Sequence, residues 1–313
     1  MMIALRIARA ATMRPRIVIF TDSYHGHYDA TQAAADPSGE SYFGVPLSPG
    51  IPRGALGDVL VLPYGADVSL QVIADQAEEL AAVVVEPLQT RHPELQPKEF
   101  LQKLRALTKE ADVPLIFDDV VTGFRVAQGG AQEWAGVRAD MAIYGKALAG
   151  GMPMAVIAGS ARFLDGIDGG AWNFGDTSEP HALEIFTSST FAKHPLSLAA
   201  ARAVLGRIDE AGPSLQENLN AQTHRIVVSL NDSLQKEGFP IRFASWGSFF
   251  GPSWVGDENW SIAIPPLHYA LASEGIYLYG ASGFLSSAHT TEELDHLCAT
   301  FQKVVSQLKP PHS

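Results

Sequence analysis

Short apolar runs alternate with stretches of helical periodicity along the first two thirds of this chain, and this alternation limits the folds open to it. The helical stretches at 68–80 and 97–111 lie between such runs. The apolar runs are Ile17–Phe20, Val59–Leu62, Ala82–Val85, Leu115–Phe117, Met141–Tyr144 and Ala155–Ala158. Apolar strands joined by amphipathic helices are typical of a mostly parallel sheet covered on both faces. The sequence therefore predicts an α/β fold, whose functional side chains lie just past the carboxyl ends of strands.

The pattern changes after Gly212. A polar helix at 215–236, short strands at 241–250 and 276–279 and a last helix at 291–308 predict a smaller α+β domain. We therefore expect a large domain at 1–212 and a small one at 213–313. Within the large domain, the segments 29–57 and 165–181 have the composition of loops.

The N-terminal residues carry arginines without acids, as a transit peptide does. The periodic spacing of the apolar residues from Ile3 to Ala8 and the break at Pro15 favour an ordinary helix to about Met13, followed by the strand Arg16–Phe20. We interpret the start of the chain as part of the fold.

The composition excludes several classes of function. The net charge of -12 over 313 residues argues against a nucleic-acid-binding protein, which needs clustered Lys and Arg for phosphates. Cys298 is the only cysteine, so one chain can form neither a disulfide nor a multi-cysteine metal site, as expected for the cytoplasm. No apolar run is long enough to span a membrane. These features favour a cytoplasmic protein that handles small molecules.

A lysine follows directly on a predicted buried strand. The segment 144–153 reads YGKALAGGMP, and Lys146 stands where its amine can be desolvated. Burial favours the neutral amine, which is the form that condenses with an aldehyde. The segment alone leaves open a surface lysine in a glycine-rich turn.

Two adjacent carboxylates end the run LIFDD at 115–119. Strand alternation sends Asp118 and Asp119 to opposite sides, so one can face a ligand while the other pairs elsewhere. The carboxylate could bind a metal, act as a general base or hold a protonated pyridine nitrogen. A metal is the least favoured, because no nearby acid or histidine completes a coordination set. The structural alternative is a pair that caps the turn at 122–125, with Arg125 as its salt-bridge partner.

Two further strand ends carry polar or aromatic residues. His25 and His27 follow the strand ending at Phe20, but they lack the i, i+4 helical spacing of zinc sites. Tyr24 suits stacking on a planar ligand. Glu86 follows the apolar run 83–85. We expect one sheet edge to carry an aromatic residue, acids and a lysine.

These segments resemble class III pyridoxal-phosphate aminotransferases of fold type I across nearly the whole chain. They are most similar to glutamate-1-semialdehyde 2,1-aminomutase-like enzymes, especially aminotransferase domains of polyketide and nonribosomal peptide synthases. The resemblance rests on Asp118 and Lys146 at matching spacing and on the segments 86–97, 129–132, 169–176 and 190–196. It implies a mostly parallel, seven-stranded-type sheet flanked by helices, a smaller C-terminal domain and pyridoxal 5'-phosphate as cofactor.

The resemblance also implies roles for individual residues. Lys146 would hold the cofactor covalently and then move a proton between substrate and cofactor. Asp118 would pair with the pyridinium nitrogen, so that the ring acts as an electron sink. Val120 would pack on one face of the ring and Tyr24 on the other, with His25 beside it.

Three more positions match the family's pattern. Glu86 would lie near the cofactor and the substrate side. Thr190 matches a residue that reaches the cofactor phosphate of the neighbouring subunit, which implies a homodimer. The segment 286–289 (SSAH) matches a C-terminal signature near the mouth of the active site.

The chain departs from the family's pattern in three places. It begins inside the helix that should follow a Gly-Thr phosphate-binding loop, so we expect an N-terminally truncated chain that lacks this loop. Asp119 stands where the family has glutamate. The segment 281–284 (ASGF) offers no arginine for a substrate carboxylate, which disfavours a simple α-amino-acid specificity.

Three hypotheses about function follow. The first is amino-group transfer from a donor such as glutamate or glutamine to an oxo-acceptor, with a β-oxoacyl group on an acyl carrier protein as a candidate acceptor. The second is an aminomutase that moves nitrogen within one molecule. The third is an inactive truncated remnant with a structural or docking role, because a lost phosphate site removes several charge-assisted hydrogen bonds.

Overall fold

The computed structural model describes residues 1–182, 185–253 and 264–308. By its internal contacts the chain divides into two units, which are described separately. Unit 1 comprises Met1–Pro87, Pro97–Gly123 and Gly129–Arg207, and unit 2 comprises Leu88–Gln96, Phe124–Gln128 and Ile208–Ser313. The limits predicted from the sequence place the boundary slightly later and treat each domain as continuous.

Unit 1 is built on a mostly parallel sheet, and the expected α/β class is confirmed. Within the described residues this sheet has six strands, in the order β4-β1-β5-β6-β7-β8, which is one fewer than the seven expected. The last strand, β8, pairs antiparallel with β7 at one edge. The strands are β1 (Arg16–Phe20), β4 (Val59–Leu62), β5 (Leu80–Val85), β6 (Leu115–Asp119), β7 (Met141–Tyr144) and β8 (Val156–Gly159).

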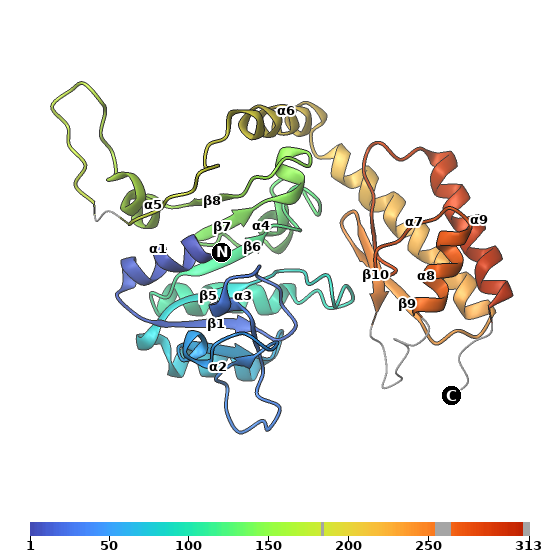
Figure 1. Ribbon diagram of the computed structural model, residues 1–313, viewed down its shortest axis with the longest axis horizontal. Coiled ribbons are helices and arrows are strands. Elements are labelled where there is room, and N and C mark those ends of the chain that lie inside the picture. The colour runs from blue at the N-terminus through green and yellow to red at the C-terminus, as the bar shows by residue number, and fades with distance from the viewer. Residues whose placement is uncertain (183–184, 254–263, 309–313) are drawn as a thin grey trace. The chain divides into compact units, whose positions relative to one another are not determined.

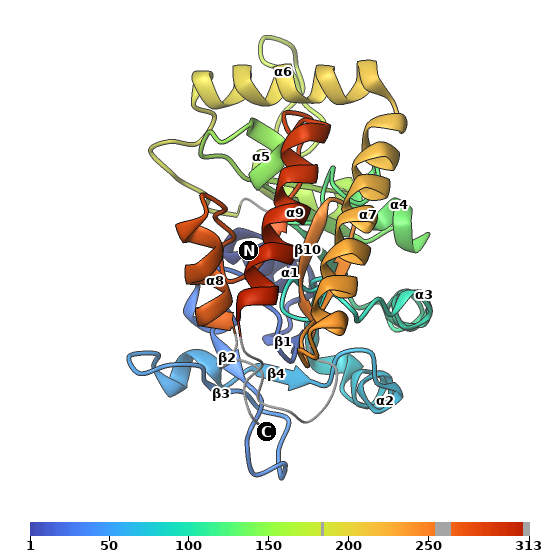
Figure 2. The same ribbon diagram turned by 90° about the vertical axis from the view of Figure 1, so that its right-hand side faces the viewer.

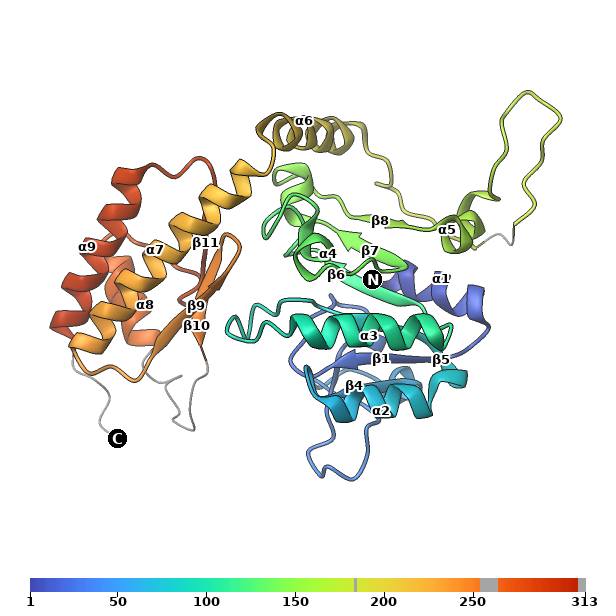
Figure 3. The same ribbon diagram turned by 180° about the vertical axis from the view of Figure 1, so that it is seen from behind.

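Helices cover both faces of this sheet, which explains why its central strands are apolar throughout (Figures 1 and 3). Ile17 and Ile19 of β1 share an apolar cluster with residues of α1 and α5. Val18 and Phe20, which point to the other face, pack in a second cluster with residues of α3 and α4 and with Ile73 of α2. The helices are α1 (Met2–Thr12), α2 (Asp67–Asp75), α3 (Lys98–Glu110), α4 (Gly130–Ala135) and α5 (Ala161–Asp168).

Three expectations about the connections need correction. The predicted helix 68–80 ends at Asp75, because a 3-10 turn (Ala77–Glu79) intervenes and Leu80 already belongs to the buried strand β5. The expected loop 29–57 contains the strands β2 (Ala33–Ala34) and β3 (Val45–Pro46) and the 3-10 turns Asp29–Thr31 and Arg53–Leu56. The expected loop 165–181 begins within α5, which ends at the left-handed Gly169.

The chain beyond α5 loops away from the sheet before α6 (Pro195–Ala211) begins (Figure 1). This segment exposes aromatic side chains: Phe174 is 99% exposed, Phe186 78% and Phe191 75%. At the start of α6, the hydroxyl of Ser197 donates a hydrogen bond to the carbonyl of Pro153 at 3.1 Å.

Unit 2 has a three-stranded antiparallel sheet in the order β11-β10-β9, packed against helices (Figure 2). Its core brings Ile226 and Leu230 of α7 together with Phe250 of β10 and Phe301 of α9. A capping box between Thr290 and Glu293 begins α9. The elements are α7 (Ser214–Lys236), β9 (Arg242–Trp246), β10 (Phe249–Ser253), α8 (Ile264–Ser273), β11 (Gly283–Phe284) and α9 (Thr291–Gln307).

The strand expected at 276–279 is wrong. Only Tyr279 makes a bridge there, to Ser282, and the strand that pairs with β10 is β11. Within the described ranges, no helix has the length and apolar character needed to cross a bilayer.

Candidate active site

The carboxyl ends of four neighbouring parallel strands meet at one edge of the unit 1 sheet. The strand order β1-β5-β6-β7 places Tyr24 and His25 after β1, Glu86 after β5, Asp118 at the end of β6 and Lys146 after β7. The expectation that these side chains come from one edge of the sheet agrees with this topology.

Asp118 is held in place on both of its oxygens. Nδ1 of His25 lies 2.7 Å from Oδ2, and the backbone N–H of Val120 donates to Oδ1 at 3.2 Å. Asp118 is 6% exposed and His25 3%. A buried carboxylate with two donors is fixed in orientation. His25 therefore holds Asp118 in place, a contact that the sequence did not predict.

Asp119 points to the opposite side of the strand, as alternation predicts. Its Oδ1 accepts hydrogen bonds from the hydroxyl of Thr122 at 2.5 Å and from the backbone N–H of Ala131 at 3.1 Å. Its Oδ2 is buried without a partner among the described residues. Asp119 therefore has the turn-capping role that was the structural alternative for the pair.

The position of Asp119 gives it an unusual acidity. Burial, with a smaller contribution from the charge of Asp118, raises the pKa of Asp119 to about 6, although the bonds from Thr122 and Ala131 oppose this shift. A raised carboxyl pKa means that the folded protein binds more protons than the unfolded chain between about pH 4 and 6. The free energy of unfolding therefore falls as pH rises through this window.

We expect Asp119→Asn to remove this dependence. The asparagine keeps an oxygen for Thr122 and Ala131 but cannot ionise, so the variant should gain about 1–3 kcal/mol relative to the parent between pH 4 and 7. Urea unfolding of both proteins across this range measures the difference. The control is Asp75→Asn on the exposed end of α2, for which the difference should stay flat. A flat difference for Asp119→Asn would contradict the assignment.

Glu86 connects the β1 and β5 ends of the edge. It is 4% exposed, and its Oε2 accepts a hydrogen bond from the backbone N–H of Tyr24 at 3.1 Å. Tyr24 is itself 44% exposed, which leaves this aromatic residue available to a planar ligand. Tyr64 lies close by and donates to the carbonyl of Pro87 at 2.7 Å. Burial, together with the charge of Glu86, holds the pKa of Tyr64 well above its ordinary value, so the phenol stays neutral.

Lys146 lies in a backbone conformation that L residues seldom adopt. It has φ +43° and begins a 3-10 turn (Lys146–Ala149) directly after β7 and Gly145. Such outliers collect at functional sites, because only the surrounding structure can stabilise them. The residue as a whole is exposed in this chain.

Val120 connects the Asp118 and Lys146 strand ends. A side chain on Gly145 would come within 3.3 Å of Cγ1 of Val120. Val120 therefore packs against Gly145, the residue directly before Lys146. The ends of the neighbouring strands β6 and β7 thus carry Asp118 and Val120 on one side and Lys146 on the other.

Thr190 is exposed and makes no hydrogen bond to these residues within the described part of its own chain. His27 is exposed and meets only the edge of the Tyr24 ring, with 6.1 Å between ring centroids. Over the described ranges, no group of three or more His, Cys, Asp and Glu side chains could hold a metal ion.

Two contributors to this edge were missed by sequence reasoning. Gln32 donates to the carbonyl of Gly26 and so closes the loop that carries Tyr24 and His25. Tyr64 supports the turn after Glu86. The first bond spans six residues in the sequence and the second 23. Only the amide of Gln32 or the hydroxyl of Tyr64 could have drawn attention to them.

Comparisons with known proteins agree with this geometry. The family model described as aminotransferase class-III matches residues 1–305. Glutamate-1-semialdehyde 2,1-aminomutase of Desulfovibrio desulfuricans is 32% identical over 320 residues, which cover 97% of this chain and 71% of that protein. A structure described as a transaminase with PLP bound has 28% identity and a TM-score of 0.84, covering 98% of this chain and 70% of its own. An omega-transaminase from Sphaerobacter thermophilus has 28% identity and a TM-score of 0.85, with coverages of 97% and 71%.

Proposed function

The chain belongs to the class III aminotransferases, and from this premise we propose that it transfers an amino group from an amino-acid donor to an oxo-acceptor. The observation that carries the proposal is the row Asp118, Val120 and Lys146 on adjacent strand ends, with His25 bonded to Asp118. Pyridoxal 5'-phosphate is the cofactor of this family of enzymes.

The residues at this edge fit the cofactor. Pyridoxal phosphate supplies an electron sink that stabilises the negative charge left when the substrate carbon loses a proton. Asp118 is a buried carboxylate in fixed orientation, which suits it to hold a proton on the ring nitrogen. His25 donates through Nδ1 and keeps Asp118 in that orientation. Its own Nε2 is buried without a partner in the described structure.

The remaining residues bind and orient. Lys146 would provide the amine for covalent attachment of the cofactor and for returning a proton to the substrate carbon. Val120 and the exposed ring of Tyr24 are apolar surfaces for the two faces of a planar ring. Glu86 orients the loop of Tyr24 through the backbone, so we propose a positioning role for it on the substrate side.

The donor reaction gives a direct test. Protein loaded with pyridoxal phosphate is mixed with L-glutamate or L-glutamine and no acceptor, and the 2-oxo acid is quantified. We expect close to one equivalent of oxo acid per site, because without an acceptor the reaction cannot go beyond the donor half. Loaded protein that releases no oxo acid with any donor would contradict amino transfer and favour a structural or docking role.

An aminomutase is the second candidate, and the names of the similar curated proteins favour it. A mutase moves nitrogen within one molecule and needs no separate donor. Turnover of glutamate 1-semialdehyde to 5-aminolevulinate without added amino donor would identify this activity. The same preparation should then release little oxo acid from glutamate.

For the acceptor we propose a β-oxoacyl group carried on an acyl carrier protein. The support is the resemblance of the segments at 86–97 and 169–176 to aminotransferase domains of polyketide and nonribosomal peptide synthases. Competition between a carrier-bound 3-oxoacyl thioester and the free 3-oxo acid tests it. Amination of the free acid at an equal rate would contradict a role for the carrier protein.

We further propose that the chain forms a homodimer through the segment before α6. Phe174, Phe186 and Phe191 are largely exposed there, and Thr190 lies in the same segment. Exposed aromatic groups in such number mark an interaction surface. The double variant Phe186→Ser and Phe191→Ser should shift the mass measured by light scattering from dimer to monomer. The control, Tyr269→Ser on α8, should leave the mass unchanged.

A further inference from the structure

A cavity of about 630 Å³ lies in unit 1 at the opposite end of β7 from Lys146. Asp140 precedes β7, whereas Lys146 follows it, so the cavity lies at the amino ends of the parallel strands. Helix α3 contributes two lining residues, and the end of β8 contributes two more. The lining residues are Arg105, Lys109, Gln132, Arg138, Ala139, Asp140, Ala142, Ala158, Gly159 and Ser160.

The charge of the lining is positive in a chain whose net charge is -12. Arg105, Lys109 and Arg138 face one carboxylate, Asp140. That carboxylate is engaged, because its Oδ2 accepts from Arg105 at 2.6 Å and from the backbone N–H of Leu115 at 2.9 Å. The cationic side chains of Lys109 and Arg138 therefore remain as the excess charge of the cavity.

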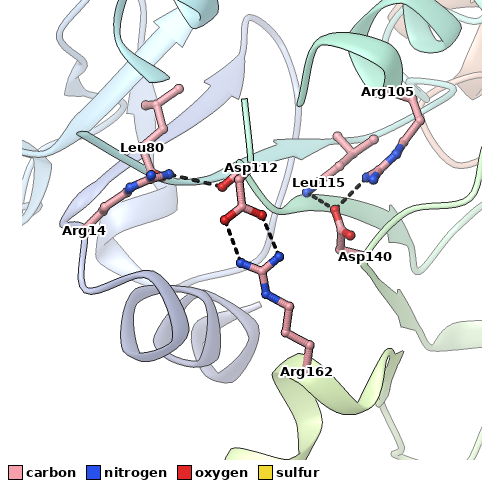
Figure 4. A network of polar contacts seen from close by, with 7 residues as sticks. All are labelled: Arg14, Leu80, Arg105, Asp112, Leu115, Asp140 and Arg162. Atoms are coloured by element: carbon pink, nitrogen blue, oxygen red, sulfur yellow. Dashed lines mark hydrogen bonds and ion pairs between the residues drawn. The ribbon is translucent and has the colours of Figure 1, made fainter. Parts of the chain in front are cut away.

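The neighbouring carboxylate of Asp112 is also paired with an arginine. Figure 4 shows Arg162 forming two parallel hydrogen bonds with Asp112, at 2.6 and 2.9 Å, beside the Arg105–Asp140 pair. Arg14 donates to the backbone carbonyls of Asp112 and Leu80 in the same network (Figure 4). In this network Asp140 pairs with Arg105 and Asp112 with Arg162, and neither Lys109 nor Arg138 belongs to these two pairs.

Ser160 and Gly159 shape the rest of the cavity lining. Ser160 is the N-cap residue of α5, and its hydroxyl does not bond the backbone amides of that helix. Ser160 lines the cavity, and the positive end of a helix favours a negatively charged group. Glycine at 159 is required, because a side chain there would lie 2.7 Å from the carbonyl oxygen of Asp140. The close approach of β8 to the start of β7 thus shapes the cavity.

We propose that this cavity binds the phosphate group of a small soluble metabolite, with Lys109 and Arg138 as its principal charged contacts. Arg105 and Lys109 lie four residues apart on α3 and so share one face of the helix. The volume is in the range of small-molecule sites. The site is separate from the cofactor edge, and its occupancy does not depend on the proposed amino transfer.

Isothermal titration of the cofactor-loaded protein with inorganic pyrophosphate tests the site, since loading keeps the probe from the cofactor's own phosphate position. We expect the double variant Lys109→Gln and Arg138→Gln to raise the Kd for pyrophosphate about tenfold or more. The matched control, Lys103→Gln with Arg202→Gln, removes the same charge, and neither of its residues lines the cavity. The control should bind as the parent does.

Citrate provides a second arm, because it is a polyanion without phosphate. Tight binding of pyrophosphate with weak binding of citrate supports a phosphate site. The proposal is wrong if the parent does not bind pyrophosphate, if citrate binds equally well, or if the control loses as much affinity as the cavity variant.

Discussion

Replacing Lys146 with alanine is expected to lower the turnover number at least about 10³-fold and to abolish covalent retention of the cofactor. The reason is that Lys146 brings an amine to the sheet edge directly after β7, on a backbone held at φ +43°. The measurement is borohydride reduction of the loaded protein, followed by mass spectrometry of the peptide that contains residue 146. In the parent, this peptide should gain the mass of the reduced cofactor.

The matched variant Lys146→Arg separates charge from nucleophilicity. Arginine keeps the cation but cannot lose its proton to form a covalent bond. It should therefore behave as the alanine variant does, whereas Lys103→Ala on α3 should retain the labelled peptide. A parent protein labelled at any lysine other than Lys146 would contradict the assignment.

Asp118→Asn should have the next largest effect, a fall in turnover of about 10²–10³-fold. The amide cannot hold a proton on the ring nitrogen by charge, although its size preserves the bond from the Val120 backbone. Steady-state kinetics with saturating donor measure the loss, and the visible spectrum of the loaded protein reports the state of the ring. Asp119→Asn is the control, because that carboxylate points to the other side of the strand and should change turnover little at neutral pH.

His25 is expected to act through Asp118. His25→Ala should lower turnover about tenfold, because Oδ2 of Asp118 loses its donor at 2.7 Å. In the double variant with Asp118→Asn, the two losses should not add, since residues that act as a unit are non-additive. Fully additive losses would show that His25 has a separate role. A normal spectrum in His25→Ala would likewise contradict a positioning role for it.

The sheet of unit 1 was predictable because its strands are covered on both faces and are therefore apolar throughout. The runs at 59–62 and 141–144 agree with β4 and β7 to the residue. The local sequence pattern did not predict the correct element where a short segment is compatible with two structures. Leu80 continues a helical period but belongs to β5, and the run at 276–279 is apolar but lies outside the strand that pairs with β10.

The site shows the same division. Strand alternation alone separated Asp118 from Asp119, and the position of the lysine after β7 located Lys146. The partner of Asp118 was not predictable, because His25 lies 93 residues away and reaches it only through the β1-β5-β6 strand order. The exposure of Lys146 was also not predictable, because it depends on what packs beyond the strand end.

The sequence by itself determined the fold class, the family resemblance and the strand ends that carry the chemistry, because apolar periodicity and residue spacing are local properties of the chain. Only the tertiary structure decided which side chains meet: His25 with Asp118, Glu86 with the Tyr24 backbone, and three cations around a cavity at the far end of β7. These contacts depend on strand order and register. Those are set by the packing of helices on both faces of the sheet, and no single segment contains that information.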